Sequence, residues 1–173
     1  MRRAPTPIPA DPDDARKAAY GVALRLLAGR EMSSGRLRER LGSRGFPDEL
    51  NEAIVDRLTR AGILDDRRAA LAAARTLVAV RQRGRHRVAR ELERLGFTKE
   101  QAQDATESVL AETDERAVIA RVVASKLRGR PSTGDPASYR RLYAALLRRG
   151  FPADLIRTVL RPYWQHRAEP PQE

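Results

Sequence analysis

Apolar residues recur along this chain in one arrangement that occurs three times. The pair Gly-Phe stands at residues 45–46, 96–97 and 150–151, so the copies lie roughly 50 residues apart. In each copy, apolar residues lie four and eight positions before the glycine, which places them on one face of a helix. Such a period predicts tandem helical units rather than one irregular globule. The apolar pairs are Leu37 and Leu41, Val88 and Leu92, and Leu142 and Leu146.

Residues that begin and end helices flank these apolar stripes. The serines at 33–34 can cap a helix, and Gly45 suits the left-handed residue that ends one. Pro47 can open the next helix, and Thr98 and Gln101 have the spacing of a capping box. No stretch shows the period of two that a strand requires. We therefore predict an all-α fold of three tandem three-helix repeats that form an elongated, curved body.

The domain boundaries follow from proline-rich ends and from two junctions. The first residues contain four prolines, which predicts a disordered leader, and the last residues predict a short disordered tail. A looser loop at residues 131–136 accounts for the longer third period. The predicted parts are the leader at 1–13, the three repeats at 14–63, 64–112 and 113–167, and the tail at 168–173.

Basic residues outnumber acidic ones. The chain has 34 Lys and Arg against 23 Asp and Glu, a net charge of +11 and a pI near 11.1. All but three of the basic residues are arginine. A GC-rich coding sequence favours arginine codons and is one explanation. The other is an anionic partner, which could be nucleic acid, a nucleoprotein or a membrane surface.

Two groups of arginines are the candidate partner-binding or nucleic-acid-binding residues. Each group has two interpretations: a solvated helix end, or contacts with phosphates or with an acidic protein face. Near the second group, Tyr139 and Tyr143 could stack on a base, although a place in the core is the favoured interpretation. The candidates are Arg81, Arg83, Arg85, Arg87 and Arg90 in the first group, and Arg140, Arg141, Arg148 and Arg149 in the second.

The sequence gives no sign of catalysis. It has only two histidines and no cysteine, and we find no phosphate-binding loop, nucleophile elbow or zinc spacing. The adjacent acids Asp65 and Asp66 suit a helix cap better than a metal site. We expect a protein that is not an enzyme, with no catalytic residue, metal or cofactor. Phe46, Phe97 and Phe151 are expected to be core residues.

Location is predicted from what the chain lacks. The absence of cysteine suits a reducing cytosol, and no apolar run is long enough to span a membrane. Arg2 and Arg3 are not followed by the apolar stretch of a secretory signal. We expect a cytoplasmic protein that does not bind membranes. It is expected to be a monomer, because internal repetition already supplies a long surface.

The motifs, taken together and in order, resemble the RecX family of regulators of the bacterial recombinase RecA. The junction Leu-Thr-Arg-Ala-Gly-Ile-Leu-Asp-Asp at residues 58–66 is the most family-like stretch. Residues 37–41, 44–47, 83–92 and 95–97 add to a resemblance that covers about residues 15–165. One departure is the pair Ala69-Ala70, where the family has an aromatic residue followed by alanine. The helix that carries this pair is expected to dock less tightly.

The resemblance implies a regulator without enzymatic activity. Such proteins bind the groove of a RecA filament on single-stranded DNA, and they restrain its ATP hydrolysis, strand exchange and co-protease activity. They can promote filament disassembly, and they act in recombinational repair and the SOS response. Two other hypotheses remain open: a free-standing basic helical protein that binds single- or double-stranded DNA, and a helical scaffold whose charge only reflects codon usage.

Overall fold

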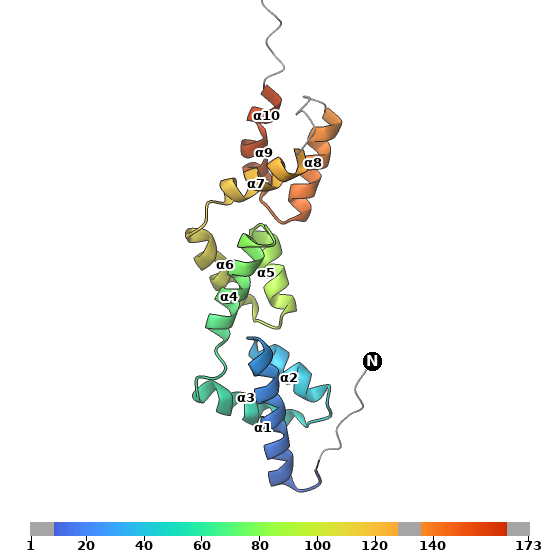
Figure 1. The fold of residues 1–173 in the computed structure, drawn as a ribbon, viewed down its shortest axis with the longest axis vertical. Coiled ribbons are helices and arrows are strands. Elements are labelled where there is room, and N and C mark those ends of the chain that lie inside the picture. Colours follow the sequence, from blue (N-terminus) through green and yellow to red (C-terminus); the bar gives the residue numbers. More distant parts are fainter. Residues whose placement is uncertain (1–8, 128–135, 166–173) are drawn as a thin grey trace, which may run out of the picture. The chain divides into compact units, whose positions relative to one another are not determined.

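The computed structural model describes residues 9–127 and 136–165, and these ranges contain helices and no strand (Figure 1). The prediction of an all-α fold is confirmed. The helices are α1 (Pro12–Gly29), α2 (Ser34–Gly42), α3 (Asp48–Arg60), α4 (Asp66–Ala79), α5 (Arg85–Arg94), α6 (Lys99–Ala111), α7 (Glu115–Leu127), α8 (Pro136–Arg148), α9 (Ala153–Leu160) and α10 (Pro162–Gln165).

The contacts divide the chain into two compact units, which we describe separately. The first unit is Met1–Ala70 with Leu92–Gln101, and the second is Leu71–Glu91 with Ala102–Glu173. Helices α4, α5 and α6 each contribute residues to both units. The three-repeat boundaries given above stay a prediction.

In the first unit, α1, α2 and α3 pack around one core (Figure 1). Helix α1 buries only alanines completely, at Ala19 and Ala23, because it lies close to its neighbours at these positions. Leu37, Leu41 and Phe46 are also buried, so the expected place of this phenylalanine in the core is confirmed. Helix α3 adds Ile54, Val55 and Leu58.

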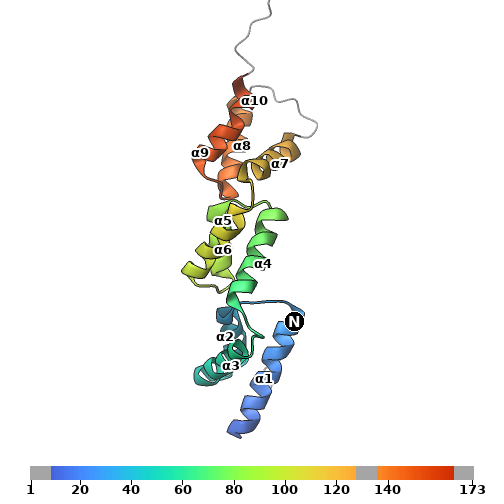
Figure 2. The same cartoon turned by 90° about the vertical axis from the view of Figure 1, so that its left-hand side faces the viewer.

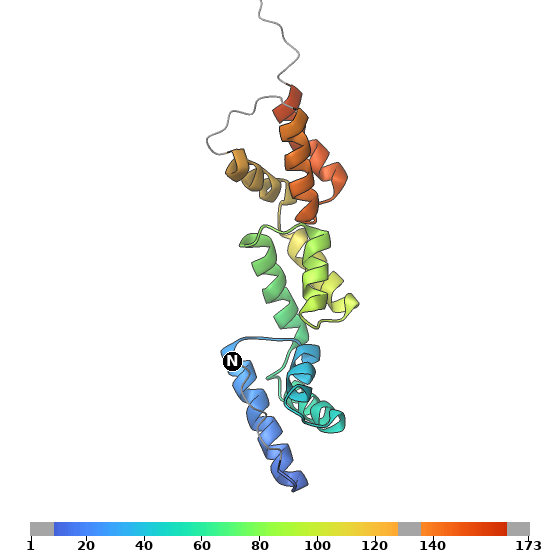
Figure 3. The same cartoon turned by 90° about the vertical axis from the view of Figure 1, so that its right-hand side faces the viewer.

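In the second unit, α7, α8 and α9 contact one another (Figures 2 and 3). Ile119 of α7, Leu146 of α8 and Ile156 of α9 have no exposed surface. Phe151 is 1% exposed, as expected for a core residue. A short helix, α10, begins at Pro162, where the sequence predicted only the end of the preceding helix.

The helix signals in the sequence act as predicted. The Oγ atom of Ser33 accepts a hydrogen bond of 3.0 Å from the backbone N–H of Arg36 at the start of α2. Thr98 and Gln101 form a reciprocal capping box, with bonds of 3.0 and 3.2 Å. The three glycines of the repeated Gly-Phe pairs adopt φ values of 91°, 89° and 89°, which disfavour a side chain.

Two boundaries differ from the prediction. Helix α1 begins at Pro12, inside the expected leader, because the Asp11 carboxylate accepts hydrogen bonds from the N–H groups of Asp13 and Asp14. From the sequence we expected a basic link from Arg81 to Arg87 before the next helix, but α5 already begins at Arg85, so the last residues of that link are helical. Residues 1–8 of the leader, most of the 131–136 loop and the 168–173 tail lie outside the described residues.

The turn that ends α5 at Gly96-Phe97 is covered by the amino end of α2. We use the name Gly-Phe corner for such a turn, which consists of the residue before the glycine, the glycine and the phenylalanine. Ser33 donates a hydrogen bond of 2.6 Å from its Oγ to the carbonyl of Leu95. A Cβ atom at Gly35 would lie 2.4 Å from the carbonyl oxygen of Gly96, so the two backbones touch.

Asp66 also bonds to the amino end of α2. Its carboxylate accepts two hydrogen bonds of 2.7 Å from the N–H and Oγ of Ser34 and one of 3.2 Å from Gln101. The adjacent Asp65 caps α4 by accepting a bond of 2.9 Å from the N–H of Arg68. The double Asp therefore caps one helix and anchors another. Sequence reasoning predicted the first role and missed the second.

The second unit repeats this arrangement at Gly150-Phe151. The N–H of Gly84, just before α5, donates a bond of 2.9 Å to the carbonyl of Arg149. The N–H of His86 donates a bond of 3.1 Å to the carbonyl of Gly150. A Cβ atom at Gly84 would lie 2.5 Å from the backbone nitrogen of Phe151. We call this contact and the one at Gly96 the corner joints.

The first prediction concerns Gly84→Ala. The added methyl group collides with backbone atoms, which cannot move aside as a flexible side chain can, so we expect a loss of about 1–3 kcal/mol. The midpoint of thermal unfolding should fall by roughly 2 to 10 °C, measured by circular dichroism. The control is Gly21→Ala in α1, where the new methyl would meet only Arg25 at 3.7 Å. An equal effect of the two substitutions would contradict the joint.

Candidate nucleic-acid and protein interface

Three arginines of the first predicted group converge on one carboxylate. Glu91, whose side chain is 14% exposed, pairs with Arg87 at 2.6 Å, Arg83 at 3.4 Å and Arg81 at 3.8 Å. Glu91 lies in α5, after Arg87 by one turn of the helix. These arginines are therefore not simply solvated residues at a helix end, since each has a partner inside the second unit. One carboxylate against three guanidinium groups leaves the cluster with excess positive charge.

Arg85 has a different partner. Its Nε donates a hydrogen bond of 3.1 Å to the Oε2 of Glu115, the first residue of α7. The Glu115 side chain is 8% exposed, and its Oε1 has no hydrogen-bond partner among the described groups. The hydrogen bond to Glu115 raises the pKa of the Arg85 guanidinium, which therefore stays charged. This pair ties α5 to α7 within the second unit.

Arg149 joins the second predicted group to the first. Its Nη1 donates hydrogen bonds of 3.1 and 3.2 Å to the carbonyls of Arg81 and Gln82. Gln82 has a φ of 50°, a conformation that is uncommon for a residue with a side chain. Arg149 thereby stabilises the segment that leads to the corner joint. No local pattern indicates that the two groups meet here, because the residues lie far apart along the chain.

The other predicted residues lie on the surface. Arg90, Arg140 and Arg148 are exposed, and in the described part of the chain no ion pair or hydrogen bond of their side chains is found. Arg141 is exposed and donates a bond of 2.9 Å to Ser138. The nine candidates thus separate into those that build the second unit and those whose charge faces solvent.

Tyr139 and Tyr143 stack on each other on α8. Their ring centroids are 5.9 Å apart and the ring planes differ by 20°. Both residues are half-buried, so the favoured core interpretation is met only in part.

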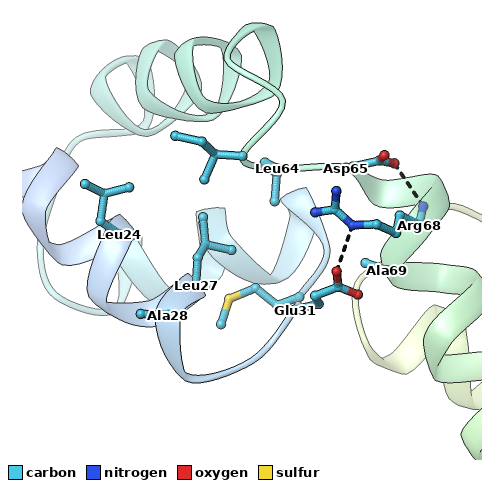
Figure 4. Close-up of a pocket in the computed structure, with 10 residues that line it drawn as sticks. Leu24, Leu27, Ala28, Glu31, Leu64, Asp65, Arg68 and Ala69 are labelled. Atoms are coloured by element: carbon cyan, nitrogen blue, oxygen red, sulfur yellow. Dashed lines mark hydrogen bonds and ion pairs between the residues drawn. The ribbon is translucent and has the colours of Figure 1, made fainter.

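An apolar pocket lies in the first unit beside Ala69 (Figure 4). Its volume is about 420 Å³, and the ion pair between Glu31 and Arg68, at 2.8 Å, stands at its edge. Ala69 is 5% exposed, so the small residue at this position is covered by its neighbours. Ala69, where the resemblance led us to expect an aromatic residue, is one of the residues that line this pocket. Its apolar lining consists mainly of Leu24, Leu27, Ala28, Met32, Ile63 and Leu64.

Two further observations concern the described residues only. In the described ranges, no helix combines the length and apolar character needed to cross a bilayer. The same residues contain no group of three or more His, Asp or Glu able to hold a metal ion.

Comparison with known proteins decides the family. The pattern described as "RecX, first three-helix domain" matches residues 19–58, and "RecX, third three-helix domain" matches residues 114–160. The regulatory protein RecX of Trichlorobacter lovleyi is 36% identical over 144 residues, which are 81% of this chain and 92% of that protein. The chain belongs to the RecX family.

Other RecX proteins agree with this assignment. The regulatory protein RecX of Mycobacteroides abscessus is 35% identical over 158 residues, covering 91% of this chain and 76% of the relative. The crystal structure of RecX from Lactobacillus salivarius superposes with a TM-score of 0.76 at 21% identity, over 87% of this chain and 97% of that one. A second RecX crystal structure gives a TM-score of 0.74 at 18% identity, over 85% and 72%. These structures support the fold.

The ion pair between Arg85 and Glu115 generates the second prediction. Arg85→Ala leaves a buried carboxylate without its partner, so we expect a loss of about 1–3 kcal/mol in unfolding free energy. Arg90→Ala removes an exposed arginine from the same helix and should change stability by less than about 0.5 kcal/mol. Thermal unfolding of the two variants provides the comparison. A larger loss from the Arg90 variant would refute the structural role of Arg85.

The third prediction tests the pocket beside Ala69. In Ala69→Phe, the ring can occupy the pocket, and we expect a gain of about 0.5–2 kcal/mol. Ala72→Phe, at an exposed position of the same helix, serves as the control and should bring no such gain. If the melting temperature of the Ala69 variant does not rise above that of the wild type, the pocket cannot accept an aromatic ring from this position.

Proposed function

We propose that this RecX-family protein binds the filament that a RecA recombinase forms on single-stranded DNA, and that it mainly inhibits the filament. The inhibited activities would be ATP hydrolysis, strand exchange and co-protease activity, in recombinational repair and the SOS response. The observation that carries the proposal is the match to regulatory protein RecX over 81% of the chain. In this proposal the protein has no catalytic activity and acts as a cytoplasmic monomer.

The charge distribution supports a role for electrostatic attraction. A net charge of +11 favours association with a nucleoprotein filament, whose DNA carries one negative charge per phosphate. Exposed arginines such as Arg90, Arg140 and Arg148 are the best candidates for direct contact, because their side chains are not engaged in the described structure. Arg81, Arg83, Arg85 and Arg87 have a structural role through Glu91 and Glu115, and their exposed parts can add to the attraction.

Because some arginines are paired with Glu91 or Glu115 and others are exposed, charge-reversal variants that test partner binding should use the exposed arginines. Reversal of Arg83, Arg85 and Arg87 would break the cluster around Glu91 and the pair with Glu115, so lost binding could reflect a damaged joint. Reversal of Arg90 and Arg148 changes the same kind of charge without removing a described ion pair.

The second candidate function is a free-standing basic protein that binds naked DNA. The excess charge around Glu91 favours it, since clustered guanidinium groups bind phosphates well. This alternative predicts that naked DNA and the recombinase filament bind with equal affinity.

The fourth prediction is tested by titrating this protein into a RecA ATPase assay that depends on single-stranded DNA. Inhibition is expected at amounts well below those that saturate the DNA, because a filament modulator acts on the recombinase and need not cover the DNA. The double variant Arg90→Glu with Arg148→Glu should inhibit more weakly, and the loss should shrink at high salt. Inhibition only at saturation of the DNA would support the DNA-binding alternative. No inhibition at any concentration would exclude the proposed function.

A further inference from the structure

The three Gly-Phe corners have nearly the same backbone geometry. In each, the phenylalanine N–H bonds back to the carbonyl of a leucine in the preceding helix, at 3.4 Å for Phe46 and at 3.3 Å for both Phe97 and Phe151. The glycine N–H makes a bond of 2.8 or 2.9 Å to the preceding turn. What fits on one corner should therefore fit on the others.

Two of the corners show what covers such a surface. Each is covered by the amino end of a helix, and a glycine at that end allows the backbones to touch. In both, a donor on the covering segment bonds to the carbonyl of the residue before the corner glycine. The donor is Ser33 Oγ at Leu95 and the Gly84 N–H at Arg149. The pairing is electrostatically favourable, since helix amino ends present N–H groups and carboxyl ends present carbonyls.

The first corner has no such cover within the described residues. Gly45 is exposed, whereas Gly150 is buried and Gly96 is half-buried. Among the described groups, none donates a hydrogen bond to the carbonyl of Arg44 or Gly45. The neighbouring Phe46 is 6% exposed and Asn51 bonds to its carbonyl at 3.0 Å, so the corner is well ordered from within its own unit.

Arg44 stands where Arg149 stands in the third corner. Arg149 reaches across to two carbonyls of the segment that covers it. Arg44 instead donates a bond of 2.6 Å from its Nη1 to the carbonyl of Arg40 in the preceding helix, α2. The first corner therefore has an arginine at the same position as the third corner. Within the described residues, this arginine has no covering segment whose carbonyls could accept its hydrogen bonds.

We infer that the Arg44-Gly45-Phe46 corner is a docking surface for the amino end of a helix on the partner protein. The contacting turn of that helix should carry glycine, alanine or serine, because a larger side chain would meet the corner backbone. The carbonyls that precede the partner helix should accept hydrogen bonds from Arg44. The identity of the partner as the recombinase rests on the proposed function.

Photo-crosslinking tests where this surface binds. The chain has no cysteine, so Arg44→Cys gives a single attachment site for a thiol-linked photoreactive group. Arg16→Cys on α1, whose native side chain is 57% exposed, is the matched control. With recombinase filaments on single-stranded DNA, we expect at least about tenfold more cross-linking from position 44. Peptide mapping should place the cross-links in the first turn of a recombinase helix that carries a small residue.

A charge reversal gives a readout without a label. Arg44→Glu should weaken filament binding in sedimentation assays by about tenfold or more, and Arg16→Glu should not weaken it. Circular dichroism must show both variants to be folded. Equal binding of the two variants, or cross-links to helix interiors, to DNA or to a second copy of this chain, would overturn the docking surface while the proposed function stands. Failure of the wild-type protein to sediment with filaments would refute both.

Discussion

Each corner joint depends on backbone atoms that touch where only glycine fits. At Gly35 and Gly84 an added methyl group would lie 2.4 to 2.6 Å from atoms of the opposing corner. Hydrogen bonds then connect helix amino ends to carbonyls that end the opposing helix. The close backbone approach at the two glycines depends little on the neighbouring side chains, and the two covering segments are Ser-Ser-Gly and Arg-Gly-Arg. The donors differ, since Ser33 uses its side-chain Oγ and Gly84 uses its backbone N–H.

The arginines around the second joint show that basic residues in this chain have two roles. Arg149 bonds to backbone carbonyls, and three other arginines share Glu91. Partly buried pairs of this kind are costly to break from one side only, because the remaining charge is left without its partner. Exposed arginines such as Arg148 carry no such cost, so their charge can serve recognition. The count of 34 basic residues therefore overstates the number of arginine side chains that are free to contact a partner.

The sequence predicted what depends on neighbours along the chain. The Ser33 cap, the Thr98 capping box and the positive φ of Gly45 all follow from local rules, and the structure confirms them. The sequence did not predict the contact of Asp66 with Ser34 or that of Arg149 with Arg81, since no local rule relates residues that are so far apart along the chain. The candidate arginines were found by composition, but their separation into structural and exposed groups required the three-dimensional arrangement.

Gly35 shows why the joint at α2 contributes to stability. Glycine inside a helix costs about 0.5–1 kcal/mol relative to alanine, and Gly35 lies in the first turn of α2. Alanine there would favour the helix but would collide with the carbonyl of Gly96. Gly35 thus lowers the intrinsic helix propensity of α2 but allows the backbone contact with Gly96. This combination is favourable only if the contact stabilises the fold by more than the helix propensity that is lost. The same reasoning applies to an external helix docked at Gly45, where the small residue must come from the partner.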